Sequence, residues 1–273
     1  MTAREWLQAA RKICPHLERF DLERVLMKHL EMQRAHLLAH LDDSLPEKVQ
    51  QALSEDLARL ADRVPLQYVL GEAWFIDALY EVNEQVLIPR FDTEYLVQAV
   101  LKRVPQAEAA VLDLCTGSGI IAISLARACA TWQLAASDLS AGALAVAKRN
   151  GERLGARVDW REGDLFVPWQ GQRFDAVVCN PPYISAEEYR SLSPEVHKEP
   201  EQALLAAHDG LVFYERLSAE AANYLKPGGW LAVEIGWQQG EAVKTLFEKH
   251  HYKEVACLPD GQGHDRVVVG HIE

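Results

Sequence analysis

The most informative stretch of the chain reads Arg173-Phe174-Asp175-Ala176-Val177-Val178-Cys179-Asn180-Pro181-Pro182-Tyr183. Its first half is apolar and β-branched, which is typical of a strand buried in a sheet. Two prolines then end the strand, because proline cannot donate a ladder hydrogen bond and holds the preceding residue extended. Ligands of open α/β sheets bind beyond the carboxyl ends of the strands. We therefore expect the Asn180 amide and the Tyr183 phenol to grip a planar polar group, although a non-functional proline-terminated loop would also fit these four residues.

Strands and helices alternate on both sides of this stretch. We expect strands at 109–115, 133–137, 157–161, 173–179 and 230–235, and helices at 92–103, 118–130, 141–155, 211–225 and 238–250. Residues 184–209 are expected to be irregular, 226–229 to form a turn, and 253–258 to pair with 266–271 as a hairpin. This alternation predicts an α/β fold with a mostly parallel sheet wound on both faces and a terminal antiparallel hairpin.

The N-terminal part has a different pattern. Three apolar stripes at helical spacing predict a bundle of three short helices over residues 1–70, with Asp21 as a possible cap and no glycine before Gly71. Residues 71–90 are β-rich and predict a hairpin linker that turns at Asn83-Glu84. Asp92 is expected to cap the first helix of a second domain, which covers residues 91–273.

Composition narrows the class of protein. The 273 residues carry a formal net charge of −12, which disfavours direct binding to a phosphate backbone and suits a protein partner with basic patches. The five cysteines form no CxxC pair, so we expect no metal site and no disulfides. We find neither a signal peptide nor an apolar run long enough to span a membrane, and we expect a cytoplasmic protein without a membrane partner.

A glycine-rich turn follows the first predicted strand of the second domain. Its residues are Cys115-Thr116-Gly117-Ser118-Gly119, and Asp138 ends the next strand about twenty residues later. Glycines let a ligand approach the backbone, and a carboxylate at the end of the second strand can accept both hydroxyls of a ribose. This pair predicts a nucleoside-type cofactor, although Asp138 alone could be only a helix cap.

The cofactor's charge is suggested by the residues around this turn. Gly117-x-Gly119-x-x-Ala122 also fits the dinucleotide fingerprint, but Asp113 adds negative charge where a pyrophosphate would lie. That charge suits a sulfonium, and we expect S-adenosyl-L-methionine. At the end of the third strand Asp164 is expected near the adenine amino group, with Leu165 against the ring.

The glycine-rich turn, Asp138 and the Asn-Pro-Pro-Tyr motif together resemble those of a known family. The second domain resembles the class I S-adenosylmethionine-dependent methyltransferases, which have a Rossmann-like fold, and Asn180-Pro181-Pro182-Tyr183 matches their motif for methylating planar nitrogens. The wider resemblance is to the PrmC (HemK) family of N5-glutamine methyltransferases, and it rests on segments 67–71, 87–94, 197–200, 209–211 and 263–268. These enzymes modify the Gly-Gly-Gln glutamine of class 1 peptide chain release factors.

The resemblance implies a role for each matching residue. It assigns Cys115, Thr116, Gly117, Ser118, Gly119, Asp138 and Leu165 to the cofactor, Pro181, Pro182 and Tyr183 to the substrate, and Asn180 to both. It also implies that the helical domain recognises the substrate. Cys115 stands where glycine is common, a spelling also seen in sister enzymes that act on ribosomal protein L3, and Phe91 stands where the family often has proline. The L3 substrate therefore stays open.

The expected reaction uses Asn180, Pro181 and Tyr183. The Asn180 side-chain oxygen and the Pro181 carbonyl would each accept one N–H of the substrate amide, while Tyr183 stacks on its plane. Two rivals remain: an adenine or guanine N-methyltransferase, which the charge disfavours because base-flipping enzymes usually carry a basic surface, and a non-catalytic module that keeps the fold as a scaffold.

Overall fold

The computed structural model describes residues 1–104 and 107–273. The chain forms two compact units. The first comprises Met1–Glu72 together with Ser193–Lys198, and the second comprises Ala73–Leu192 and Glu199–Glu273. None of the helices in the described ranges is long and apolar enough to cross a membrane.

The first unit is helical. Its helices are α1 (Ala3–Ile13), α2 (Arg19–Leu30), α3 (Arg34–Ala39), α4 (Glu47–Ala61) and α5 (Leu66–Leu70). The three predicted helices correspond to α1, α2 and α4, whereas α3 and α5 are too short for a periodic stripe and were missed. Asp21 is not the cap of α2: the helix begins earlier, after Glu18, and the Asp21 carboxylate accepts a hydrogen bond from the Glu18 N–H.

A short segment from late in the chain belongs to this helical unit. Within Ser193–Lys198, Glu195 lies 2.7 Å from the Arg63 guanidinium, and the Lys198 ammonium lies 2.7 Å from the Asp62 carboxylate. Two ion pairs therefore hold a piece of the loop that follows the Asn-Pro-Pro-Tyr motif. The sequence contains no pattern that would predict this grouping.

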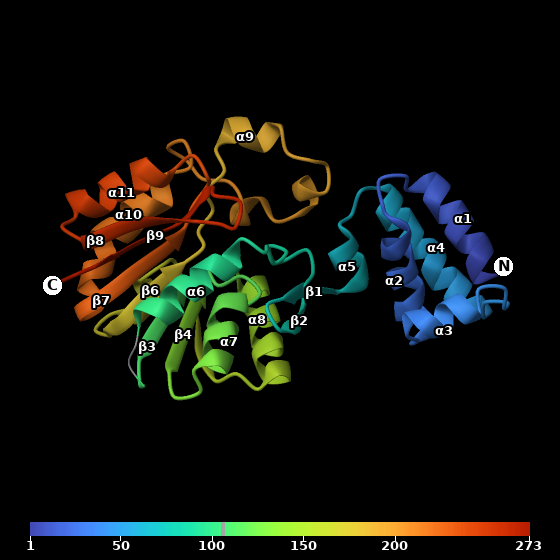
Figure 1. Ribbon diagram of the computed structural model, residues 1–273, viewed down its shortest axis with the longest axis horizontal. Helices are drawn as coiled ribbons and strands as arrows, with labels where there is room; N and C mark the ends of the chain where they lie inside the picture. The colour runs from blue at the N-terminus through green and yellow to red at the C-terminus, as the bar shows by residue number, and fades with distance from the viewer. Residues whose placement is uncertain (105–106) are drawn as a thin grey trace. The chain divides into compact units, whose positions relative to one another are not determined.

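The second unit is built on a seven-stranded sheet in the order β5-β4-β3-β6-β7-β9-β8 (Figure 1). Its strands are β3 (Ala110–Leu114), β4 (Gln133–Asp138), β5 (Val158–Glu162), β6 (Phe174–Cys179), β7 (Leu225–Glu234), β8 (Lys253–Pro259) and β9 (Asp265–His271). The pairs from β5 to β7 are parallel, and β9 is antiparallel to both of its neighbours. The predicted fold class is confirmed.

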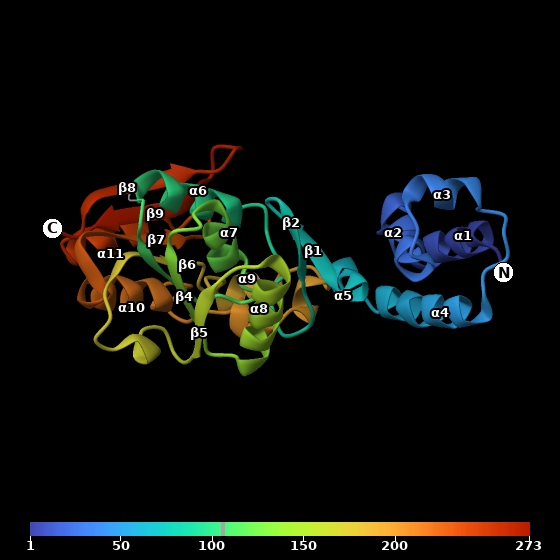
Figure 2. The ribbon, with the colours of Figure 1, turned by 90° about the horizontal axis from the view of Figure 1, so that it is seen from below.

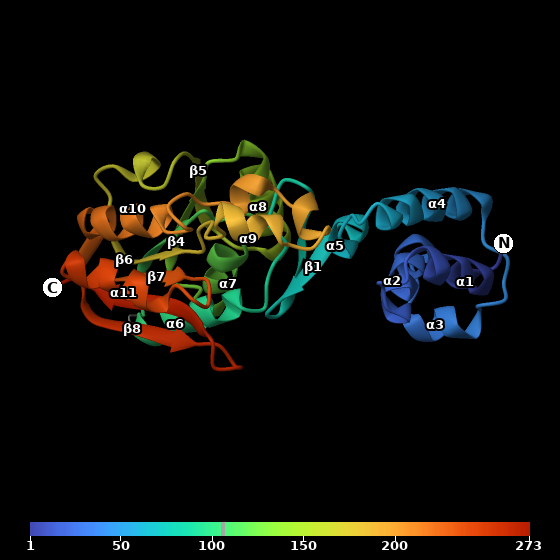
Figure 3. The ribbon, with the colours of Figure 1, turned by 90° about the horizontal axis from the view of Figure 1, so that it is seen from above.

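Helices cover both faces of the sheet, so that each face has its own apolar core. The views in Figures 2 and 3 show α6 and α7 on one side and α10 and α11 on the other. The helices are α6 (Thr93–Arg103), α7 (Ile120–Ala128), α8 (Ala141–Leu154), α9 (Ala186–Arg190), α10 (Val212–Glu220) and α11 (Gly240–Lys249). Short 3-10 helices occur at Val167–Trp169, Val196–Lys198, Glu201–Ala203 and Ala221–Asn223. The stretch 184–209, expected to be irregular, thus contains α9 and two 3-10 turns.

A hairpin forms in the linker, but it is not the one predicted around Asn83-Glu84. Strands β1 (Glu72–Phe75) and β2 (Ala78–Glu81) are joined through Ile76 and Asp77, not through Asn83-Glu84. Ile76 has φ +52°, a left-handed conformation that a β-branched residue rarely adopts, so its sequence does not indicate a turn. Asn83 does form a turn, because its carbonyl accepts from the Val86 N–H, but the described residues between it and α6 contain no strand to complete a hairpin there.

The predicted turn at 226–229 lies inside a strand. Leu225 pairs with Phe174, and Trp230 pairs with Ala176, so that four residues of β7 stand opposite one residue of β6. The Pro-Gly-Gly sequence therefore forms a bulge, which accommodates extra residues without ending the strand.

Candidate active site

A cavity opens at the carboxyl ends of β3, β4, β5 and β6. It lies at the point where the strand order reverses between β3 and β6, which is where doubly wound sheets bind ligands. Its empty volume is about 960 Å³, open solvent included, within the range of small-molecule sites. The lining residues come from five segments: 85–93, 115–121, 138–143, 163–165 and 180–182, with Gln202, Ala203 and Phe213.

The glycine-rich turn forms one wall of the cavity. Cys115 and Gly117 both have positive φ, +56° and +57°, so the chain bends sharply between β3 and α7. A Cβ placed on Gly117 would meet nothing within 4 Å, which leaves the backbone open to a ligand. Thr116 and Ser118 also line this wall and are otherwise buried.

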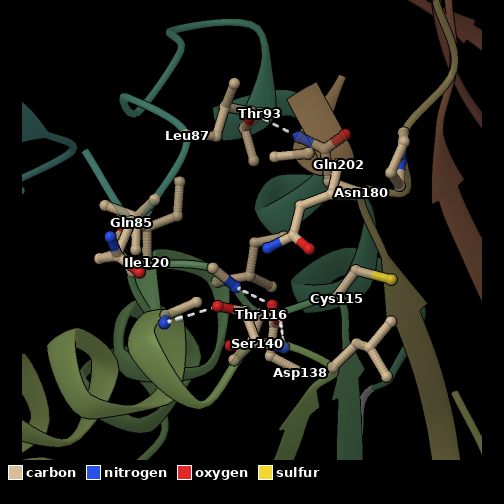
Figure 4. Close-up of a pocket in the computed structure, with 18 of the residues that line it drawn as sticks. Gln85, Leu87, Thr93, Cys115, Thr116, Ile120, Asp138, Ser140, Asn180 and Gln202 are labelled. Carbon is tan, nitrogen blue, oxygen red and sulfur yellow. Dashed lines mark hydrogen bonds between the residues drawn. The ribbon is translucent and has the colours of Figure 1, made fainter. Parts of the chain in front are cut away.

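Asp138 lies at the end of β4, directly beside this turn. Its carboxylate accepts hydrogen bonds from the Gly117 N–H at 2.8 Å and from the Ser140 N–H at 2.9 Å. Figure 4 shows these bonds on the opposite side of the cavity from Asn180. Burial raises the pKa of Asp138 above its usual value, and the backbone donors partly offset that rise. The carboxylate is thus held in place with lone pairs left for a ligand.

Asp113 does not line the cavity, which corrects the expectation that its charge faces the ligand. Its carboxylate is fully buried and accepts from the Thr116 hydroxyl at 2.6 Å and the Ala122 N–H at 3.1 Å. Burial raises the pKa of Asp113 to about 7. The side chain points inward because it joins the turn to the first turn of α7.

Leu165 and Asp164 both line the cavity beyond β5. The Leu165 carbonyl accepts from the Ser137 hydroxyl, and the Trp169 indole N–H donates to the same hydroxyl at 3.0 Å. Leu165 has φ +43°, and this buried bond holds it there. Asp164 is half-exposed and pairs with Arg216 at 2.7 Å, so its carboxylate is shared with a cation.

The Asn-Pro-Pro-Tyr motif follows β6, and its Asn180 and Pro182 line the wall opposite the glycine-rich turn. The Asn180 amide Nδ2 donates to the Thr93 hydroxyl at 3.2 Å, as Figure 4 shows. The Tyr183 carbonyl accepts from Gln239 Nε2 at 3.1 Å. A Cβ on Gly210 would lie 2.2 Å from that carbonyl oxygen, so Gly210 packs against the motif as closely as a backbone can.

The predicted site residues fall into two groups. Cys115, Thr116, Gly117, Ser118, Asp138, Leu165, Asn180 and Pro182 line the cavity. Gly119, Pro181 and Tyr183 do not. Gly119 instead packs beneath the turn, where a Cβ would lie 3.0 Å from both Ile123 and Trp160. Pro181 is buried, and Tyr183 is partly buried beside the motif.

Several cavity residues carried no predicted role. Residues 85–90 cross its mouth, Gln202 and Ala203 come from the stretch expected to be irregular, and Phe213 comes from α10. Arg90 pairs with Glu199, whose other carboxylate oxygen accepts from the Ile88 N–H at 3.0 Å. Glu199 is buried, so it fixes this segment. Asp92, expected to cap α6, makes no capping bond and lies 3.3 Å from Arg266.

The charges and shape fit S-adenosylmethionine. Among the described lining residues, Asp138 and Asp164 are acidic and Arg90 is the one base, and Arg90 is already paired. Such a lining suits a cationic ligand better than a pyrophosphate, which would also compete for the Gly117 N–H that Asp138 accepts. Leu139, Leu165 and Phe213 supply apolar surface against which an adenine ring could pack. The described residues contain no group of three or more metal-ligating side chains.

The comparisons with known proteins cover almost the whole chain. A family model described as methyltransferase small domain matches residues 91–257, and one described as PrmC N-terminal domain matches residues 4–71. A release factor glutamine methyltransferase of Geobacter sulfurreducens is 44% identical over 93% of this chain and 89% of its own length. One of Enterococcus faecalis is 36% identical over 92% of each.

A solved structure shows the same fold at lower identity. The methyltransferase from Pyrococcus furiosus has a TM-score of 0.55 and 18% identity, and the match covers 83% of this chain and 98% of that one. The cofactor of this methyltransferase family is S-adenosylmethionine. Identity above one third over nearly the full length shows that the chain belongs to the release factor glutamine methyltransferase family.

Proposed function

We propose that the protein transfers a methyl group from S-adenosylmethionine to the side-chain amide nitrogen (N5) of the glutamine in the Gly-Gly-Gln motif of class 1 peptide chain release factors. One observation supports this proposal above the others. Asn180 presents its carboxamide to a cavity whose opposite wall, with Gly117 and Asp138, fits a nucleoside cofactor. The relatives at 36–44% identity are named for this reaction.

An amide nitrogen must be held firmly before it can accept a methyl group. Its lone pair is delocalised into the carbonyl, as in the peptide bond. Within the described residues, neither the Oδ1 of Asn180 nor the carbonyl of Pro181 receives a hydrogen bond. We assign to these two oxygens the two N–H groups of the substrate amide. Two fixed acceptors hold the nitrogen in place and direct its lone pair, which is a positioning effect.

S-adenosylmethionine, when bound, supplies an electrophilic methyl group on a sulfonium. In this proposal Asp138 accepts the ribose hydroxyls, the turn Cys115–Gly119 backs the donor, and Leu165 packs on the adenine. Tyr183 lies beside the motif and outside the cavity lining, and we assign it to stacking on the amide plane, where it would exclude water. Once methylated, the amide nitrogen carries a positive charge and loses its extra proton to water. No histidine lies among the described lining residues, and this chemistry requires no dedicated base.

The same proposal covers the partner and the place of the reaction. The formal net charge of −12 favours a protein substrate with basic patches and disfavours direct nucleic-acid binding. The helical domain 1–70 is assigned to recognising the release factor, the segment 71–90 to linking, and 91–273 to catalysis. We place the reaction in the cytoplasm, where release factors serve translation.

The test separates protein from nucleic acid as the acceptor. S-adenosylmethionine with a tritiated methyl group is incubated with the enzyme and either a purified class 1 release factor or total RNA and genomic DNA. We expect label on the release factor and none when its Gly-Gly-Gln glutamine is changed to alanine. Label on nucleic acid, or on the altered release factor, would contradict the proposal.

A further inference from the structure

A buried polar cluster lies directly behind Asn180. Thr93, the first residue of α6, is fully buried, and its hydroxyl accepts the hydrogen bond from Asn180 Nδ2 at 3.2 Å. Glu234, the last residue of β7, is 1% exposed. Thr93 and Asn180 lie near its carboxyl group, and both lower its pKa against the rise caused by burial. Side chains from α6, from β7 and from the residue that follows β6 therefore lie together at the rear of the motif.

This cluster determines which way the Asn180 carboxamide points. An asparagine side chain presents two donors on one side and an acceptor on the other, and a half-turn about its last bond exchanges them. Thr93 and Glu234 offer oxygen acceptors, so the amide NH2 turns towards them and Oδ1 turns away. A reversed carboxamide would place a donor where the proposed reaction needs an acceptor and would bring Oδ1 against the Glu234 carboxylate.

A role in folding stability alone accounts poorly for this cluster. A charged carboxyl group in an apolar strand is costly to bury unless it is well paired, yet Glu234 Oε2 has no hydrogen-bond partner in the described part of the chain. The charged groups around Glu234 are Arg266 and Asp92, with the phenols of Tyr183 and Tyr214. Arg266 is shared with Asp92 and Asp260, each 3.3 Å away, so its charge is not devoted to Glu234.

We infer that Thr93 and Glu234 are positioning residues that orient the Asn180 carboxamide with its oxygen towards the substrate amide, an inference that rests on the proposed function. Neither residue lies in the predicted motif. Thr93 lines the cavity next to Asn180, whereas Glu234 acts only through Thr93 and Asn180. The chain thus uses a hydroxyl and a carboxylate to set the direction of a third side chain.

Glu234 also makes this orientation depend on pH. Burial raises the pKa of its carboxyl group to about 7, and Thr93, Arg266 and Asn180 each offset part of that rise. Above that pH the carboxylate can accept a hydrogen bond from the Thr93 hydroxyl, whose oxygen lone pairs then remain available to the Asn180 amide. Below it the protonated carboxyl group can donate to Thr93 instead, and the fixed direction of the chain of hydrogen bonds is lost.

The first experiment replaces the hydroxyl of Thr93. We expect Thr93→Val, which keeps the shape, to lower kcat for release factor methylation by about tenfold or more, with the Kd for S-adenosylmethionine changed less than threefold. Thr93→Ser restores the hydroxyl and should recover most of kcat. Ser124→Ala is the matched control. The Ser124 hydroxyl is also buried, but it forms a 3.1 Å hydrogen bond with Tyr80, and neither residue lines the cavity. It should lower Tm without changing kcat.

The second experiment follows kcat against pH for the wild type and Glu234→Gln. The wild-type kcat should fall as the pH drops below 7, and the variant should lack that fall between pH 6 and 8. Unchanged kcat in Thr93→Val, no recovery in Thr93→Ser, or an identical pH profile in Glu234→Gln would overturn the inference. Wild-type turnover on the release factor is measured first, and its absence would instead contradict the proposed function.

Discussion

Asn180 is held from behind by Thr93 and faces the cavity in front. Asn180→Ala removes one of the two proposed acceptors of the substrate amide while leaving Asp138 and the glycine-rich turn intact. We expect kcat to fall by about a hundredfold, the order associated with misplaced reacting groups. Calorimetry should show that S-adenosylmethionine still binds, at least in part. Near-normal turnover in this variant would show that the assigned mechanism is wrong.

Asp138 should affect the cofactor instead of the chemical step. Asp138→Ala removes the acceptor for the ribose and also frees the Gly117 and Ser140 N–H groups. Hydrogen bonds to charged groups contribute about 1.5–3 kcal/mol each, so the Kd for S-adenosylmethionine should rise at least about tenfold.

Asp159→Ala is the control for that variant. It removes the same charge from an exposed position on neighbouring β5, where Asp159 pairs with Arg161. Calorimetric affinities that fell equally in both variants would point to a general charge effect and not to a ribose contact.

The sequence predicted the site residues whose role depends on local backbone chemistry. Gly117 bends a strand-to-helix turn, Asp138 ends the next strand, and the prolines hold Asn180 extended. Each of these features depends on a stretch of only a few neighbouring residues. Thr93, Gln202 and Phe213 reach the cavity from distant segments, which no spacing rule joins. Glu234 did carry a signal, since a carboxylate within the apolar run Leu231–Ile235 needs a buried partner.

The stretch after the motif is shaped by one close contact. Gly210 has φ +84°, and a Cβ there would lie 2.2 Å from the Tyr183 carbonyl oxygen. Gly210→Ala should therefore displace Tyr183 and lower kcat by at least about tenfold, because a shift of about 1 Å in a catalytic group can cost a hundredfold. The strained backbone adds a stability loss of about 1–3 kcal/mol.

Gly155→Ala separates the two effects in that experiment. Gly155 ends α8 with φ +69°, yet its Cβ position is open. The variant should show a similar loss in Tm with unchanged kcat. If Gly155→Ala and Gly210→Ala lowered kcat alike, the contact with Tyr183 would not explain the loss.

The helices and strands of the sheet were predicted well because their patterns are long and periodic. The expected strand at 109–115 is β3, and the expected helix at 141–155 is α8, each within one residue of its observed ends. The errors lie where the backbone departs from a residue's preference. Ile76 takes a left-handed conformation at the hairpin turn, and the Pro-Gly-Gly of β7 stays within the sheet.

The segment Ser193–Lys198, which follows the motif in the sequence, belongs to the helical unit. The Glu195 and Arg63 side chains pair at 2.7 Å and are about one-third exposed, and such pairs contribute about 0–1 kcal/mol. Glu195→Gln should therefore speed amide hydrogen exchange at residues 196–198 by up to about fivefold. Glu241→Gln, which breaks a surface pair in α11, is the control. Equal exchange at 196–198 in both variants would show that the pair does not hold this segment.

Different parts of the chain support the type of reaction and the type of substrate. We propose that the sheet, its glycine-rich turn and the motif serve methyl transfer to an amide nitrogen, and the same four-residue motif would suit adenine. The acidic surface and the N-terminal helical domain argue for a protein substrate. Ribosomal protein L3 is the remaining protein alternative, because Cys115 gives the turn a spelling shared with the enzymes that modify it.

One measurement addresses both the acceptor atom and the substrate. A class 1 release factor and ribosomal protein L3 are incubated together with the enzyme and S-adenosylmethionine, and peptides of both are analysed by tandem mass spectrometry. We predict a single added methyl group on the glutamine of the release factor's Gly-Gly-Gln motif and an unmodified L3. A methyl group on L3 alone, or on any release factor residue other than that glutamine, would contradict the proposed function.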